Sequence, residues 1–80
     1  MTTYAGRCTY GKDERNWIEP LTTSNVSECQ QECLVTRGCV AFSYGKETTD
    51  NCILYEGGPY THGDSRLETT CYIMPEGKLP

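Results

Sequence analysis

The residues with the most reactive chemistry in this 80-residue chain are its six cysteines. An even number of cysteines in so short a chain predicts disulfide bonds, and the count alone leaves their pairing open. Zinc binding is the competing interpretation, but no Cys-x-x-Cys pair occurs and His62 is the only histidine. We therefore expect three disulfides, no bound metal and no cofactor. The cysteines are Cys8, Cys29, Cys33, Cys39, Cys52 and Cys71.

A second group of side chains with binding chemistry lies between residues 55 and 66, where tyrosine, histidine, aspartate and arginine are separated by glycines. A tyrosine ring stacks on a sugar or anchors a protein contact, and glycines let the backbone approach a ligand. Alternatively, the tyrosines cover a small sheet and the glycines only shape turns. The only tryptophan is either a core plug or an exposed anchor for a partner. The candidate ligand-binding residues are Trp17, Tyr55, Tyr60, His62 and Asp64.

Catalysis has little support in this sequence. His62 and Asp64 lie close together with a serine beside them, but catalytic triads are assembled from separated segments and not from one short loop. If all the cysteines are paired, none is a nucleophile, so we expect no enzyme and no catalytic residues. Calcium needs several converging oxygen ligands, and we interpret the pairs Glu47 with Asp50 and Asp64 with Glu68 as solvated loop charge.

The composition narrows the class of protein. Seven basic residues against eleven acidic ones give a net charge of −4, so neither nucleic acid nor an anionic membrane surface is an expected partner. No stretch approaches the roughly 20 apolar residues of a membrane helix, so we expect no membrane insertion by this chain. A core from 36 % hydrophobic residues stabilises so small a domain by only about 3–5 kcal/mol, and covalent links are needed in addition.

The cysteine density also indicates where the protein resides. Disulfides persist in oxidising compartments, so we expect an extracellular or cell-surface location. The first residues have no basic segment and no apolar run, and we expect a signal peptide to lie outside this chain. In that setting the sequon Asn25-Val26-Ser27 makes Asn25 a candidate for N-glycosylation.

These residues must be positioned by a helix and a few strands. Ser27 followed by Gln30 has the form of a capping box, which predicts a helix over Glu28–Arg37 that ends at the left-handed cap Gly38. Cysteines 29 and 33 are one turn apart on one face, which must be buried, and cysteine 39 is close enough to turn back onto cysteine 33.

Strands are predicted after the helix. Val40–Tyr44 alternates, and a polar loop leads from it into Cys52–Tyr55, which predicts a β-hairpin with a long tip. A further strand is expected at Thr69–Met74 and a shorter one around Tyr4–Tyr10. The expected core residues are Val26, Leu34, Val40, Phe42, Ile53, Leu54 and Ile73.

This ordered set of cysteines and elements resembles the PAN/apple domain family. The resemblance rests on Ser27–Cys33, on Gly38–Tyr44 and on Asn51–Tyr55, with Cys8 and Cys71 outside them. It implies an α+β fold in which a curved antiparallel sheet cradles one helix. It also implies the disulfides Cys8–Cys71, Cys29–Cys52 and Cys33–Cys39. The expected organisation is a lead-in over residues 1–7, one domain over 8–74 and a flexible tail over 75–80.

The resemblance implies a non-enzymatic extracellular recognition or adhesion module that contacts proteins, as one unit of a larger secreted or surface protein. A carbohydrate-binding module and a structural spacer are the alternatives, and a small inhibitor or toxin is less favoured because no basic reactive loop is visible. A protein interface predicts that Trp17, Tyr55 or Tyr10 is exposed. A sugar site predicts a cluster of Tyr60, His62 and Asp64. The oligomeric state stays open.

Overall fold

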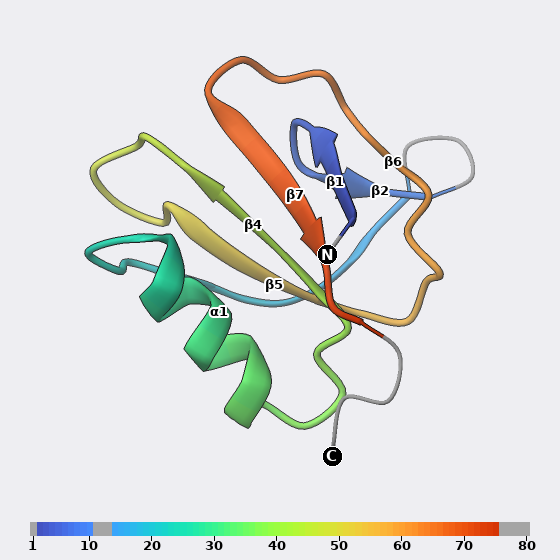
Figure 1. The fold of residues 1–80 in the computed structure, drawn as a ribbon, viewed down its shortest axis with the longest axis horizontal. Coiled ribbons are helices and arrows are strands. Elements are labelled where there is room, and N and C mark those ends of the chain that lie inside the picture. The colour runs from blue at the N-terminus through green and yellow to red at the C-terminus, as the bar shows by residue number, and fades with distance from the viewer. Residues whose placement is uncertain (1, 11–13, 76–80) are drawn as a thin grey trace.

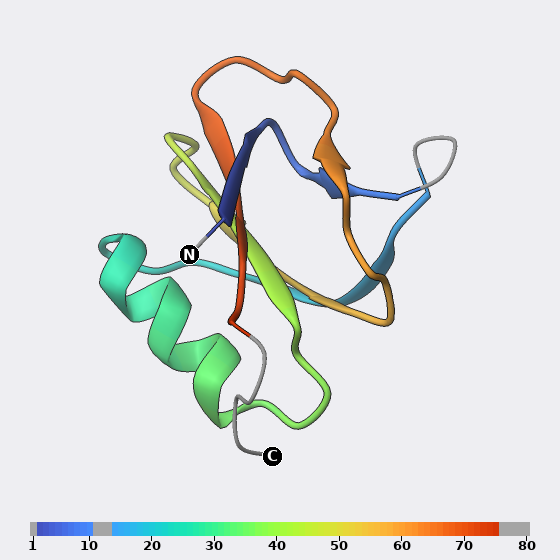
Figure 2. The same ribbon diagram turned by 45° about the vertical axis from the view of Figure 1, so that its right-hand side comes forward.

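The computed structural model describes residues 2–10 and 14–75. Its main element is a five-stranded antiparallel sheet with the strand order β1-β7-β4-β5-β3 (Figure 1). Helix α1 lies on one face of this sheet, and a two-stranded sheet formed by β2 and β6 lies on the other (Figure 2). The elements are β1 (Thr2–Ala5), β2 (Cys8–Thr9), β3 (Asn16–Leu21), α1 (Val26–Val35), β4 (Ala41–Gly45), β5 (Cys52–Glu56), β6 (His62–Gly63) and β7 (Thr69–Ile73). The predicted α+β class, with one helix and an antiparallel sheet, is confirmed.

Helix α1 begins two residues earlier than the predicted capping box. Its N-cap is Asn25, whose Oδ1 accepts a hydrogen bond from the backbone N–H of Glu28 at 2.9 Å. Glu28 in turn accepts at Oε1 from the backbone N–H of Ser24 at 2.8 Å. The box at Ser27 and Gln30 was therefore wrong, because Asn25 caps equally well and lets Val26 pack against the core.

The helix also ends earlier than predicted. Thr36 is the C-cap, and its backbone N–H donates to the carbonyl of Cys33. Arg37 therefore lies beyond the last turn, not within it. Gly38 does adopt a left-handed conformation, with φ of 86°, but it serves the turn that returns the chain to Cys39.

The centre of the sheet follows the sequence prediction. Strands β4 and β5 form the expected antiparallel hairpin, with Phe42 opposite Leu54, and β7 pairs with the other edge of β4. Val40 precedes β4 and is 38 % exposed, so it does not belong to the buried strand face.

Two segments of the sheet differ from the prediction. Strand β3 was missed because Glu19 and Pro20 lie within it, and proline is tolerated there since β3 is an edge strand. Residues 2–5, expected as part of a lead-in, form β1 and pair with β7. The short strand expected around residues 4–10 is divided between β1 and β2. Of the expected tail, residues 76–80 lie outside the described residues.

The core has two layers, one on each face of the main sheet, because neighbouring strand residues point to opposite faces. Phe42 and Leu54 belong to the layer beneath α1, whereas Ala41 and Ile53 belong to the layer beneath the β2–β6 sheet. Among the other expected core residues, Val26 and Ile73 are partly buried and pack against these layers. Leu34 is 39 % exposed, because cysteines 29 and 33 occupy the inward face of α1.

The six cysteines form three disulfides, two in the core layer beneath α1 and one in the layer beneath the β2–β6 sheet. None of the six cysteine residues is more than 1 % exposed. The bonds tie α1 to β5, α1 to the segment before β4, and β2 to β7, so the helix and the β2–β6 sheet are each joined covalently to the main sheet. The pairs are those that the family resemblance implies: Cys29–Cys52, Cys33–Cys39 and Cys8–Cys71, with Cα–Cα distances of 5.6, 5.3 and 4.9 Å.

Candidate functional site

The structure buries two of the five candidate ligand-binding residues. Tyr55 is fully buried, and its hydroxyl lies 3.0 Å from the hydroxyl of Ser43. Tyr60 is 5 % exposed, and its hydroxyl accepts from the backbone N–H of Asn16 and donates to the carbonyl of Glu56. Burial raises the pKa of both tyrosine hydroxyls above the ordinary value. The two rings therefore belong to the core and have almost no surface to offer a ligand.

The side chain of Asp64, in the loop after β6, forms hydrogen bonds and ion pairs within the domain. Its Oδ1 accepts from the backbone N–H groups of Arg7 at 2.9 Å and Arg66 at 3.0 Å. Its Oδ2 lies 3.4 Å from a guanidinium nitrogen of Arg15 and 3.8 Å from Nε of Arg66. Burial alone would raise the pKa of Asp64, but these N–H groups and guanidinium charges lower it below the ordinary value. The ionised carboxylate therefore connects its own loop to the segments that contain Arg7 and Arg15.

His62 does not join the other two members of the expected sugar site. It lies in β6 opposite Thr9 and is partly buried. In the described part of the chain, its ring hydrogen-bonds only to the hydroxyl of Thr61, at 3.1 Å. With Tyr60 in the core and Asp64 engaged by arginines, the predicted cluster is not assembled as an exposed polar site.

Trp17 is the candidate that remains available to a partner. The chain has six tyrosines, one phenylalanine and one tryptophan, and Trp17, at 48 %, is the only one of these side chains that is exposed. It lies on edge strand β3 opposite Tyr55, so it shares the sheet face that carries β2 and β6. The guanidinium carbon of Arg7 lies 5.7 Å from the ring centroid, within the range of a cation–π contact.

Three arginines contact either this tryptophan or Asp64. The guanidinium of Arg7 lies over the Trp17 ring, and Arg15 and Arg66 share the carboxylate of Asp64. We call Trp17, Arg7, Arg15 and Arg66 the Trp–Arg surface. Sequence reasoning missed it because the arginines are far apart in the chain and no motif links them. The expectation that a protein interface would expose Trp17 identified one of its four members.

The backbone edge next to this surface is protected against strand pairing. Strand β3 is the last strand of the main sheet, but Pro20 removes one of its hydrogen-bond donors. A register shift between Trp17 and Glu19 also distorts the edge. Both features discourage addition of another strand to this edge.

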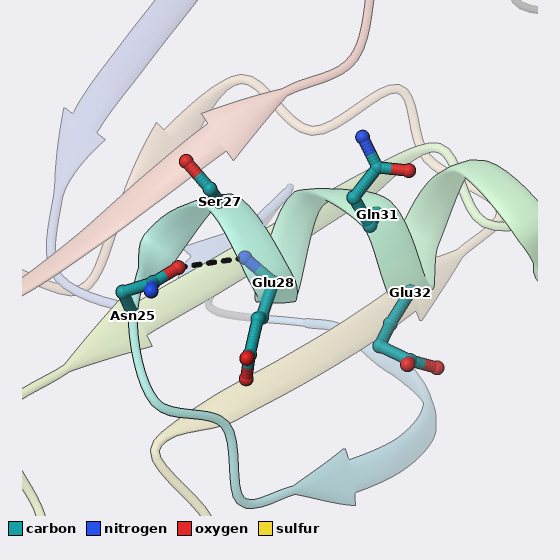
Figure 3. Close-up of a pocket in the computed structure, with 5 residues that line it drawn as sticks. All are labelled: Asn25, Ser27, Glu28, Gln31 and Glu32. Atoms are coloured by element: carbon teal, nitrogen blue, oxygen red, sulfur yellow. Dashed lines mark hydrogen bonds between the residues drawn. The ribbon is translucent and has the colours of Figure 1, made fainter.

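The other feature of interest is an open hollow of about 550 Å³ beside the first turns of α1 (Figure 3). It is polar and acidic, and it contains the side chain of Asn25 from the sequon. In Figure 3 the Oδ1 of Asn25 points to the backbone nitrogen of Glu28, while the amide nitrogen Nδ2 points away from this bond. Glycosylation attaches to Nδ2, so the cap bond and a glycan do not compete. The lining residues are Asn25, Ser27, Glu28, Gln31 and Glu32.

The described residues offer neither a metal site nor a membrane-spanning helix. Within residues 2–10 and 14–75, no group of three or more histidine, cysteine, aspartate or glutamate residues is placed to hold a metal ion. No helix in that part of the chain is long and apolar enough to cross a membrane.

Comparison with known proteins assigns a family. Residues 2–77 match the family model of the PAN domain. Searches of curated proteins and of solved structures found no match. PAN domains are, in general, protein- or carbohydrate-binding modules of extracellular proteins and are typically non-enzymatic. Since the match covers nearly all of the 80 residues and the fold has the expected helix, sheet and disulfides, the chain belongs to the PAN domain family.

Proposed function

We propose that this PAN domain is a non-enzymatic recognition module that binds an extracellular protein through the Trp–Arg surface. The observation that carries the proposal is the exposure of Trp17, in a domain whose other aromatic side chains are buried or partly buried. Tryptophan and arginine are the residue types most enriched at the energetic centres of protein interfaces. A half-exposed indole stacked with a guanidinium is therefore a suitable anchor.

We favour a protein ligand over a sugar because the predicted cluster of Tyr60, His62 and Asp64 does not form an exposed polar site. A sugar site needs several polar groups around an exposed aromatic ring, and the predicted group does not supply them. Tyr60 is buried and the carboxylate of Asp64 already accepts two backbone N–H groups. Trp17 has a guanidinium over its ring, and an aromatic ring next to an arginine suits a protein interface.

Three disulfides make the domain a rigid support for this surface. The pairing Cys8–Cys71 joins β2 to β7, and β2 directly follows Arg7. A support of this kind keeps the anchor residues in place before binding, which reduces the entropy lost on association. Such bonds fit an oxidising compartment, so we place the domain in a secreted or surface protein in which it is one unit among others.

The test compares the oxidised wild-type domain with Trp17→Ala on an array of extracellular proteins and on a glycan array. We expect protein binding that weakens roughly tenfold or more in Trp17→Ala, since truncation of a central aromatic anchor has a large effect. The matched control is Val35→Ala, which removes a 75 % exposed apolar side chain from α1 on the other face of the sheet. This variant should bind like the wild type.

Two outcomes would contradict the proposal. Selective glycan binding that is lost in Trp17→Ala, without any protein partner, would make the domain a carbohydrate-binding module. Absence of binding by a domain with verified disulfides would leave a structural spacer as the better interpretation. Thermal unfolding of each variant shows whether the fold persists.

A further inference from the structure

We infer that the partner of the Trp–Arg surface presents a short acidic segment with an apolar side chain next to its carboxylates. This inference rests on the proposed function, because it names the chemistry of the partner at the same surface. The observation behind it is a local group of positive charges in an acidic domain. The chain has a net charge of −4, yet three of its arginines gather around one aspartate beside the exposed tryptophan.

Asp64 neutralises the three arginines only in part. Its Oδ1 is committed to the backbone N–H groups of Arg7 and Arg66. Its Oδ2 faces two guanidinium groups at 3.4 and 3.8 Å, which are long distances for charge-assisted hydrogen bonds. Asp64 thus pairs with two of the three guanidinium groups and not with that of Arg7, so the four named residues and Asp64 together have an excess of positive charge in a domain that is acidic as a whole.

Arg7 is the arginine of the Trp–Arg surface whose charge is not paired with Asp64. In the described part of the chain it forms no salt bridge, and its guanidinium lies against the Trp17 ring. Neither Glu14 nor Glu19, the acidic residues that flank Trp17 in sequence, pairs with an arginine among the described residues. Since Arg7 forms no ion pair there, its guanidinium N–H groups can donate to a carboxylate of a partner. That carboxylate would lie beside the exposed indole, because the guanidinium carbon of Arg7 is 5.7 Å from the centroid of the Trp17 ring.

The charge of the whole domain limits the length of this anion. A long sulfated polysaccharide needs an extended basic track, and beyond this surface it would meet a domain with eleven acidic residues. A short acidic segment of a protein contacts the arginines without extending over the acidic remainder. Its apolar side chain covers the exposed part of the Trp17 ring, which a sulfated sugar does not provide.

Trp17 is also the reporter for the test, because it is the only tryptophan and its emission responds to what covers the ring. The oxidised domain is titrated with a short synthetic peptide of alternating glutamate and leucine, with the corresponding lysine–leucine peptide, and with a heparin oligosaccharide. We expect a saturable change in Trp17 emission with the acidic peptide alone, and weaker binding as salt is added.

Variants locate the charge that is responsible. Arg7→Gln should weaken binding of the acidic peptide about fivefold, as expected for one partly exposed charge contact. Lys46→Gln is the matched control, because Lys46 is an exposed cation that pairs with Glu68 outside the Trp–Arg surface. It should leave the affinity unchanged.

The inference is overturned if the acidic peptide gives no saturable change, if both peptides act alike, or if Arg7→Gln and Lys46→Gln have equal effects. Binding of the heparin oligosaccharide without binding of the acidic peptide would also overturn it and assign a sulfated carbohydrate. These outcomes can be distinguished from a failure of the proposed function itself. If array partners are lost in Trp17→Ala but bind independently of salt and of Arg7, the domain still binds protein through Trp17 and only the acidic chemistry is wrong.

Discussion

At the scale of single residues, Asp64 contributes the most to order around the Trp–Arg surface. It accepts backbone N–H groups at Arg7 and Arg66 and faces the guanidinium of Arg15, so one carboxylate joins the segment before β2, the segment before β3 and the loop after β6. Its side chain is only 17 % exposed. Because hydrogen bonds to a charged group stabilise more than neutral ones, removal of this charge has consequences for the whole loop.

We expect Asp64→Asn to lower the free energy of unfolding at neutral pH by about 2 kcal/mol, the size of charged hydrogen bonds lost from a partly buried site. The folded-state pKa of Asp64 lies below its ordinary value of 3.8. The stabilisation from ionised Asp64 is therefore present above that value and is lost as the pH falls through the folded-state pKa. Urea denaturation at neutral and at strongly acidic pH should show that the wild type and Asp64→Asn converge in acid.

Asp50→Asn is the control for this prediction. Asp50 is exposed in the tip of the β4–β5 hairpin, with a left-handed φ of 53° that asparagine tolerates well. Its substitution should change the stability little at either pH. A constant difference between wild type and Asp64→Asn across the pH range would mean that the charge of Asp64 is not what stabilises the loop.

At the scale of elements, the start of α1 combines a structural role with a modification signal at one residue. Asn25 caps the helix through Oδ1, and its Nδ2 is the atom to which a glycan would be attached. The helix and Trp17 lie on opposite faces of the main sheet, since Trp17 belongs to the face of Tyr55. A glycan at Asn25 would therefore leave the Trp–Arg surface open.

Variants at the sequon separate the two roles. Expressed through a eukaryotic secretory pathway, the wild type should carry an N-linked glycan that an endoglycosidase removes, and both Asn25→Asp and Ser27→Ala should lack it. Without the glycan, Asn25→Ala should lose about 1 kcal/mol of stability, whereas Asn25→Asp keeps a capping oxygen. Ser27→Ala should be close to neutral because Ser27 is not the cap. Equal masses before and after enzyme treatment would refute glycosylation, and a strongly destabilised Ser27→Ala would refute the assigned cap.

At the scale of the whole molecule, stability depends on the three disulfides more than on apolar burial. The bridges span 63, 23 and 6 residues, for Cys8–Cys71, Cys29–Cys52 and Cys33–Cys39 respectively. In the chain-entropy model they stabilise by about 4, 3 and 2 kcal/mol, because a longer closed loop restricts the unfolded chain more. These contributions are comparable with the whole stability of a small domain.

Removal of each bridge by a pair of Cys→Ala substitutions should follow this order. We expect the lowest melting temperature for the variant without Cys8–Cys71 and the highest for the variant without Cys33–Cys39. Far-ultraviolet circular dichroism during heating measures both the melting temperature and the fold that remains. Equal losses for the three variants would show that local packing of the buried sulfurs, and not loop closure, dominates.

Local patterns in the sequence determined much of this domain. The alternation in Val40–Tyr44 and the apolar run Cys52–Tyr55 predicted the central hairpin, and Thr69–Met74 predicted the strand beside it. Side-chain periodicity acts within a few residues, so these elements could be predicted without knowledge of the fold. The spacing of the cysteines, together with the helix, indicated the family and hence the disulfides.

Only the tertiary structure decided which residues form the proposed binding surface. Tyr55 and Tyr60 became core residues because the β2–β6 sheet covers their face, whereas Trp17 stayed exposed because its strand is at the edge. Arg7, Arg15 and Arg66 meet only when β2, β3 and the loop after β6 come together. The sequence determined the local elements and the covalent links, while contacts between distant segments determined which side chains stay exposed.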